Sequence, residues 1–174
     1  FSFTVEFSKG RVSFLACWLQ IWYRRVFARR IHSALLHITW GREEFMKSRT
    51  IAIACDHAGF PLKRAIHKFL VEHGYEINDL GTNSEGSVDY PEFGFAMAKV
   101  IDKGLVETGV LVCGSGIGIS IAANRNPKVR AALIHDALGA RTSRQHNNAN
   151  VICFGARMIG EDLAKDCLEV FLNT

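Results

Sequence analysis

The chain has 174 residues, a net charge of +4 and a hydrophobic fraction of 48%, which suits one compact domain with a sizeable core plus an extension. The excess positive charge lies in residues 1–45, whereas residues 46–174 carry equal numbers of acidic and basic side chains and lack the basic footprint of a nucleic-acid-binding protein. No apolar stretch reaches the ~18 residues of a membrane-spanning helix, so we expect neither nucleic acid nor a membrane as partner.

Residues 1–45 differ in character from the rest of the chain. They contain all three tryptophans and half of the phenylalanines, and they begin with Phe rather than Met. Met46, which precedes Lys-Ser-Arg and an apolar run, has the form of an ordinary protein start. We interpret residues 1–45 as a non-native extension, with a basic targeting presequence or a membrane-surface helix as alternatives, and residues 46–174 as the functional domain.

From Met46 onward, short apolar runs alternate with amphipathic stretches. The pattern predicts strands over 50–55, 75–80, 109–113, 129–135 and 150–154. It predicts helices over 60–73, 90–102, 116–123 and 161–172, and a further helix that follows the strand 129–135 and ends near residue 144. Five strands rich in Val, Ile and Ala that alternate with helices indicate an α/β protein, a three-layer Rossmann-like fold with a five-stranded parallel sheet. In such folds ligands bind at the carboxyl ends of the strands.

The run from Val110 to Ser120 is the most informative stretch of the chain. An apolar segment ends at Cys113, and glycines follow at positions 114, 116 and 118. Glycine permits positive φ and leaves backbone amides open to a ligand, and a helix that starts there favours an anion. A thiol beside such an anion cradle is favoured as thiolate, the reactive form of cysteine. Taken alone, however, Cys113 is better explained as a small buried apolar residue.

Three well-known motifs do not fit this run. The dinucleotide fingerprint follows a first strand and reads GxGxxG, whereas this run follows the third predicted strand and reads GxGxG. A protein-phosphatase cysteine would be followed by arginine six residues later, where Ile119 stands. A serine-hydrolase elbow, GxSxG, would need glycine two residues before Ser115, where Cys113 stands.

Polar residues also follow the first two predicted strands. Asp56 and His57 come directly after the first strand, where the aspartate either caps the next helix or contributes to a site, and the histidine is either a solvated loop residue or a ligand. Tyr90 either begins a helix or lines the cleft.

The later strand ends carry two further candidates. The polar run 144–148 contains His146 and Asn147, and its simplest interpretation is a turn-forming loop. Arg157 follows the last strand and is either a surface charge or a phosphate clamp that uses its planar guanidinium.

Five motifs occur in a characteristic order: Cys-Asp-His-Ala-Gly-Phe at 55–60, Asp-Tyr-Pro at 89–91, Cys-Gly-Ser-Gly-Ile-Gly-Ile-Ser-Ile-Ala-Ala-Asn at 113–124, Ser-Arg-Gln-His-Asn-Asn-Ala-Asn-Val at 143–151 and Phe-Gly-Ala-Arg at 154–157. Together they closely resemble the ribose-5-phosphate isomerase B family of sugar-phosphate isomerases. The resemblance covers about Arg49 to Leu172 and nothing in residues 1–45.

The resemblance implies an aldose–ketose isomerase that uses neither a metal nor a cofactor. Cys113 matches the base that moves a proton between C1 and C2 of the open-chain sugar, and His146 matches a residue that helps to open the furanose ring. The enediolate oxygen would be held by backbone amides with the help of Asn147. These amides belong to Gly114, Ser115, Gly116, Ile117 and Gly118.

Substrate-binding positions of the family are also matched. Asp56 and His57 match two of them, Arg157 matches an arginine on the phosphate side, and we assign Tyr90 to substrate binding as well. The family cleft is shared between two subunits, which implies a homodimer or a dimer of dimers. Family members commonly continue into an arginine-bearing tail, so phosphate binding should be weaker if Thr174 is the true end.

The expected reaction interconverts ribose 5-phosphate and ribulose 5-phosphate in the pentose phosphate pathway. Isomerisation of a six-carbon sugar phosphate, such as allose or galactose 6-phosphate, is the alternative within the same class. A non-catalytic phosphate-binding domain is the alternative outside it. The five cysteines form no CxxC or disulfide framework, which favours reduced thiols and a cytoplasmic location.

Overall fold

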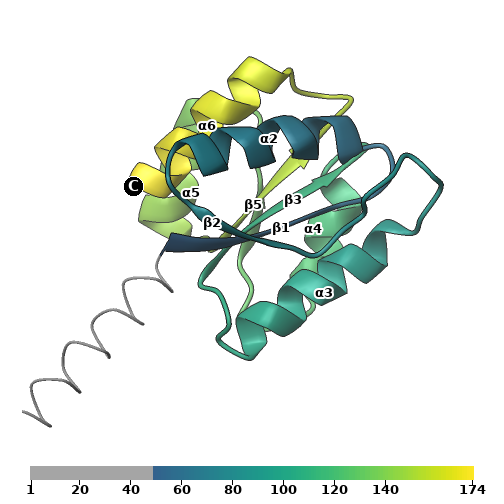
Figure 1. Cartoon of the computed structure of the whole chain (residues 1–174). Coiled ribbons are helices and arrows are strands. Elements are labelled where there is room, and N and C mark those ends of the chain that lie inside the picture. Colours follow the sequence, from purple (N-terminus) through teal and green to yellow (C-terminus); the bar gives the residue numbers. More distant parts are fainter. Residues whose placement is uncertain (1–48) are drawn as a thin grey trace, which may run out of the picture. The chain divides into compact units, whose positions relative to one another are not determined.

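The computed structural model describes residues 49–174, so our interpretation of residues 1–45 lies outside the described part. In the described part, strands and helices alternate (Figure 1). None of the helices within 49–174 combines the length and apolarity needed to cross a membrane. The elements follow in the order β1 (Thr50–Cys55), α2 (Phe60–Glu72), β2 (Glu76–Asp79), α3 (Tyr90–Asp102), β3 (Thr108–Cys113), α4 (Ile117–Ala123), β4 (Ala131–Leu133), α5 (Ala137–Asn147), β5 (Val151–Gly155) and α6 (Glu161–Asn173).

The five strands form one sheet in the order β2-β1-β3-β5-β4, and every neighbouring pair is parallel. The chain moves outward from β1 to β2 and then returns to the other side of β1 to form β3. This reversal opens a crevice at the carboxyl ends of β1 and β3, which is where open α/β sheets bind ligands. The fold therefore brings the ends of two strands, at Cys55 and Cys113, to the same place.

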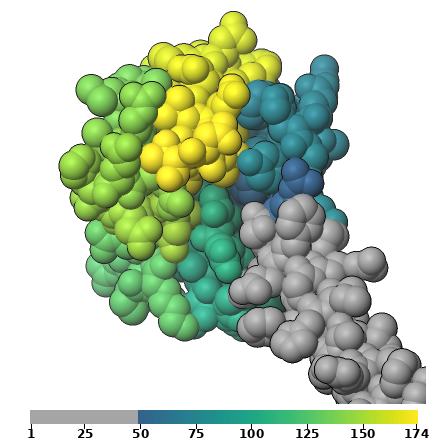
Figure 2. Space-filling view, turned by 90° about the vertical axis from the view of Figure 1, so that its left-hand side faces the viewer, coloured from purple at the N-terminus to yellow at the C-terminus, as the bar shows by residue number. Residues whose placement is uncertain are grey.

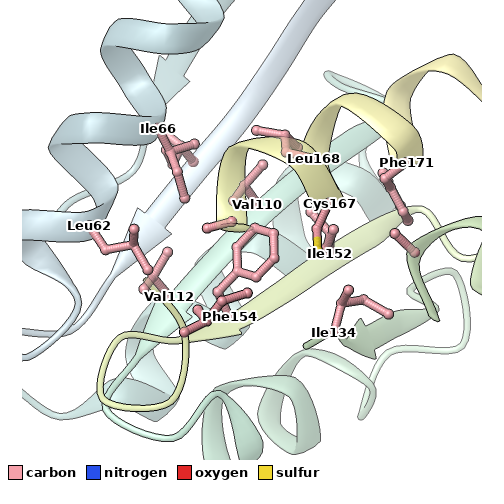
Figure 3. Packing of buried hydrophobic residues seen from close by; sticks show 14 of the residues in the cluster. Leu62, Ile66, Val110, Val112, Ile134, Ile152, Phe154, Cys167, Leu168 and Phe171 are labelled. Atoms are coloured by element: carbon pink, nitrogen blue, oxygen red, sulfur yellow. The ribbon is translucent and has the colours of Figure 1, made fainter. Parts of the chain in front are cut away.

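Alternating side chains of the central strands point to opposite faces of the sheet, as the period of two in a strand requires. One face packs under α2, α5 and α6 (Figure 3), and the other packs under α3 and α4. Figure 2 shows the first layer from outside, with α6 in yellow between α5 in green and α2 in blue. Both faces are covered because the strands are apolar on both sides, and the three-layer α/β prediction is confirmed.

Two elements differ from their predicted extents by more than one residue at an end. The strand predicted over 129–135 is reduced to Ala131–Leu133, because side-chain amides replace its first ladder bonds: Arg130 donates its backbone N–H to the Asn150 side chain at 2.8 Å. The helix predicted to end near residue 144 continues to Asn147, and Asn148 ends it with a φ of 46°. The polar run 144–148 is therefore mainly the last turn of a helix, and its interpretation as a loop was wrong.

Candidate active site

A cavity of about 450 Å³ opens at the carboxyl ends of β1, β3 and β5. Eight of the twelve residues that the sequence singled out line it, together with one that it did not. The lining residues are Asp56, Tyr90, Cys113, Gly114, Ser115, Ile117, Gly118, Arg157 and Met158.

The sulfur of Cys113 lies at the glycine turn that ends β3. Its Sγ accepts a hydrogen bond from the Gly116 amide at 3.1 Å, and the residue is 3% exposed. Gly116 has a φ of 77°, the left-handed region that L side chains rarely adopt. A Cβ there would meet Leu133 Cδ1 at 2.4 Å and the Gly155 nitrogen at 2.9 Å. Only glycine fits this position, and it holds the thiol in place at the cavity.

Arg157 covers the same turn from the β5 side. Its backbone N–H donates to the Gly114 carbonyl at 3.0 Å, and the preceding amide, from Ala156, donates to the Cys113 carbonyl at 2.8 Å. The Arg157 guanidinium lies close enough to Gly114 that a Cβ there would be 3.4 Å from Cζ. Among the described lining residues Arg157 is the one with a positive charge, and its planar guanidinium is suited to binding a phosphate with paired hydrogen bonds.

Tyr90 also lines the cavity and lies directly over Gly118. A Cβ on Gly118 would be only 2.5 Å from Tyr90 Cε2. Asp89 precedes α3 as its N-cap, and Tyr90 is the first residue of that helix. Both alternatives for Tyr90 hold, since it begins a helix and also lines the cavity.

Asp56 and His57 follow β1 but take different places. Asp56 is buried, lines the cavity and accepts the Gly59 amide on its Oδ1 at 2.8 Å, which fixes the turn into α2. The Nδ1 of His57 instead lies 3.2 Å from the Val88 carbonyl and 3.3 Å from the Val88 amide, just before α3. His57 therefore contacts the segment that leads to Tyr90 rather than lining the cavity.

The family model for the ribose/galactose isomerases matches residues 51–174. The chain belongs to this family. Ribose-5-phosphate isomerase B of Escherichia coli strain K12 is 44% identical over 125 residues, which cover 72% of this chain and 84% of the relative. The resemblance drawn from the five motifs is confirmed, and the chain is assigned to the isomerases.

Solved structures of family members agree in fold. The ribose-5-phosphate isomerase B of Clostridium thermocellum has a TM-score of 0.71 at 46% identity, over 72% of this chain and 84% of that one. The corresponding protein of Thermotoga maritima has a TM-score of 0.71 at 45% identity, over 72% and 86%.

His146 and Asn147, which the family resemblance places in the site, lie elsewhere in this chain. Both are exposed on the last turn of α5, and the Arg130 Nε donates to the Asn147 carbonyl. Asn147 lines a separate cavity of about 330 Å³ at the amino-terminal edge of the sheet. The five residues of β5 separate the two edges, which corresponds to roughly 16 Å at ~3.3 Å per residue. A single chain therefore does not bring His146 to Cys113.

Met158 is the lining residue that the sequence did not single out. It follows Arg157 in the turn after β5, is 65% exposed, and donates its amide to the Gly155 carbonyl at 2.8 Å. Its position directly after the Phe-Gly-Ala-Arg motif was the available signal, since that motif already ends a strand at the cavity. Among residues 49–174, no group of three or more His, Cys, Asp or Glu side chains is arranged to hold a metal ion.

The other three described thiols are buried away from the cavity. Burial raises the pKa of Cys55 to about 11, an effect that nearby Lys63 partly offsets, and burial likewise raises the pKa of Cys167 to about 11. Complete burial raises the pKa of Cys153 further still. These thiols stay protonated near neutral pH, and Cys113 is the described thiol that a bound sugar can reach.

Proposed function

We propose that this protein interconverts ribose 5-phosphate and ribulose 5-phosphate, a step of the pentose phosphate pathway. The observation that carries the proposal is the position of Cys113 Sγ, held by a backbone amide inside a cavity that Arg157 also lines. A base, a set of amides and a phosphate-binding cation are the groups that isomerisation of a small sugar phosphate needs. Membership of the ribose/galactose isomerase family supports the same reaction.

In the proposed mechanism Cys113 acts as the base. Its thiolate takes the C2 proton of the open-chain aldose and returns it to C1, while O1 gains a proton and the C2 hydroxyl loses one. Negative charge develops on the enediolate oxygens between these steps. The amides of the Gly114–Gly118 turn stabilise that charge, and a single such donor is typically worth about 3 kcal/mol in the transition state.

We propose a homodimer, or a pair of dimers, with sites shared between chains. Its support is that His146, the proposed ring-opening residue, lies at the opposite sheet edge from Cys113, so that a second copy has to supply it. Exposed apolar side chains on α4 favour such an association, since Ile117, which lines the cavity, is 53% exposed and Ile121, one turn later, is 60% exposed.

Mixing two inactive variants tests the shared site. Cys113→Ala and His146→Ala chains, unfolded together and refolded, would form heterodimers with one intact site, which gives about a quarter of the wild-type activity if pairing is random. No recovery from the mixture, with both variants folded, would contradict a shared site.

The reaction itself is tested by a coupled assay of wild type and Cys113→Ala. Wild type should isomerise ribose 5-phosphate in the presence of a chelator, and Cys113→Ala should lose activity by orders of magnitude while it still binds the sugar phosphate. Allose and galactose 6-phosphates belong in the same assay, because the family includes galactose isomerases. Preference for a six-carbon sugar would refute the pentose assignment, and equal activity of Cys113→Ala would refute the mechanism.

We also propose a cytoplasmic location. Its support is that Cys55, Cys113, Cys153 and Cys167 are all free and buried among the described residues, an arrangement typical of a reducing compartment. Fractionation of the source cells, followed by detection of the protein, tests it.

A further inference from the structure

Lys63 is a buried charge that the proposed chemistry leaves unused. Its side chain is 2% exposed, and its Nζ bonds both carboxylate oxygens of Asp79, at 2.7 and 2.8 Å. The Nζ also lies 5.8 Å from the centre of the Phe60 ring. Asp79 is 33% exposed, so the buried charge is the Lys63 ammonium, and its removal from water is costly even with a partner in place. Stability alone therefore does not explain why this pair is present.

Asp79 makes a second contact that leads toward the cavity. It is the last residue of β2, a four-residue edge strand, and its Oδ1 also accepts the Gly81 amide at 2.9 Å. The Gly81 carbonyl in turn accepts the Cys55 amide at 2.7 Å, and the Thr82 amide donates to the Cys55 carbonyl at 2.9 Å. The ion pair thus holds the turn after β2 against the end of β1.

Two segments lead from this turn to the cavity, one joined to it by hydrogen bonds and the other along the chain. Cys55 is followed directly by Asp56, which lines the cavity. Along the chain, residues 82–89 lead to Tyr90, which also lines the cavity, and His57 contacts that segment at Val88. Neither member of the ion pair lines the cavity itself.

We propose that Lys63 and Asp79 are positioning residues for the isomerase site. Their ion pair orders the Gly81 turn, and the turn sets where Asp56 and Tyr90 stand. This role presupposes the isomerase activity proposed above, and it concerns substrate binding more than proton transfer because neither positioned side chain is the base.

The test compares variants that leave no unpaired charge in the interior. Lys63→Met meets that condition because the Asp79 carboxylate is 33% exposed and stays in contact with water, and the double variant Lys63→Met/Asp79→Asn removes both charges. Asp79→Asn alone would leave the Lys63 ammonium buried without its partner. Lys165→Met is the matched control, since it removes a Lys–Glu pair, with Glu161 on α6, that lies outside the cavity lining. The measurements are kcat and KM for ribose 5-phosphate, and hydrogen exchange of residues 80–90.

For Lys63→Met we expect KM to rise about tenfold or more with a smaller change in kcat, and residues 80–90 to exchange faster. The double variant should match the single one, because the pair acts as a unit. Lys165→Met should leave KM and the exchange of residues 80–90 unchanged.

A folded Lys63→Met with KM within about twofold of wild type would overturn the inference, whether or not its exchange is faster. An equal rise in KM for Lys165→Met would also overturn it, since the effect would then not be specific to this pair. A wild-type protein that isomerises no sugar phosphate would instead refute the proposed function, and the exchange measurement would still decide whether the pair orders the turn.

Discussion

Replacement of Gly116 by alanine tests the glycine turn that holds Cys113. The new methyl group would sit at a φ of 77°, where a left-handed L-residue costs about 1–2 kcal/mol. It would also meet Leu133 Cδ1 at 2.4 Å and the backbone of Phe154 and Gly155 at 2.9 Å. The leucine methyl can move but the strand backbone cannot, so overpacking adds about 1–3 kcal/mol. The expected loss of unfolding free energy is about 2–5 kcal/mol.

Gly74→Ala provides a matched control for the backbone contribution. Gly74 has a φ of 79°, nearly the same as Gly116, but a Cβ there would meet nothing within 4 Å. Its substitution should therefore cost only the conformational part, about 1–2 kcal/mol. The difference between the two variants in urea unfolding isolates the crowding against β5.

Gly116→Ala and Gly74→Ala should also differ in catalytic activity. Movement of Gly116 shifts the amide that holds Cys113 Sγ, and a displacement of ~1 Å at a reacting group costs about 100-fold in rate. We expect that loss in kcat/KM for Gly116→Ala and none for Gly74→Ala, in the coupled assay with ribose 5-phosphate. Equal unfolding free energies for the two variants, with undiminished activity of Gly116→Ala, would refute this account of the turn.

Further predictions concern the cavity wall and the thiols. Gly118→Ala should raise KM severalfold, because its Cβ would displace the Tyr90 ring; an unchanged KM would show that the ring does not contact the sugar. The contribution of the buried thiols to the unfolding free energy should be constant below pH 9 and should fall between pH 9 and 11, because unfolded thiols ionise from about 9.0 while Cys55 and Cys167 keep their protons up to about 11 in the folded state. Denaturant melts across this range check it, and a rise in stability would contradict the pKa shifts. Iodoacetamide near neutral pH should alkylate Cys113 faster than Cys55 and Cys167, and ribose 5-phosphate should slow that reaction. Peptide mass mapping checks this order, and faster alkylation of Cys55 or Cys167 would contradict it.

The sequence predicted the central strands better than the extent of β4 and the end of α5. The central strands are continuous apolar runs, and a parallel sheet covered on both faces follows from them directly. The end of α5 was not predictable in the same way, because the run from Arg144 to Asn148 is polar throughout. Tertiary contacts decide it: Arg144 donates to the Ala149 carbonyl at 2.5 Å, and its guanidinium lies 5.2 Å from the Phe171 ring on α6.

The lining of the cavity was largely predictable, since strand ends in a parallel sheet meet at one edge and Asp56, Cys113 and Arg157 all follow strands. The pairing of Lys63 with Asp79 was not. Lys63 occupies an ordinary helical position in the sequence, and only the packing of α2 over β2 shows that its charge is buried.

The separation of Cys113 and His146 by the length of β5 has a consequence for how activity responds to protein concentration. If the histidine of another copy completes each site, then an isolated chain holds a base without its ring-opening group. Specific activity would then decline on dilution through the dissociation range of the dimer, and enzyme abundance in the cell would set turnover per chain as well as total flux.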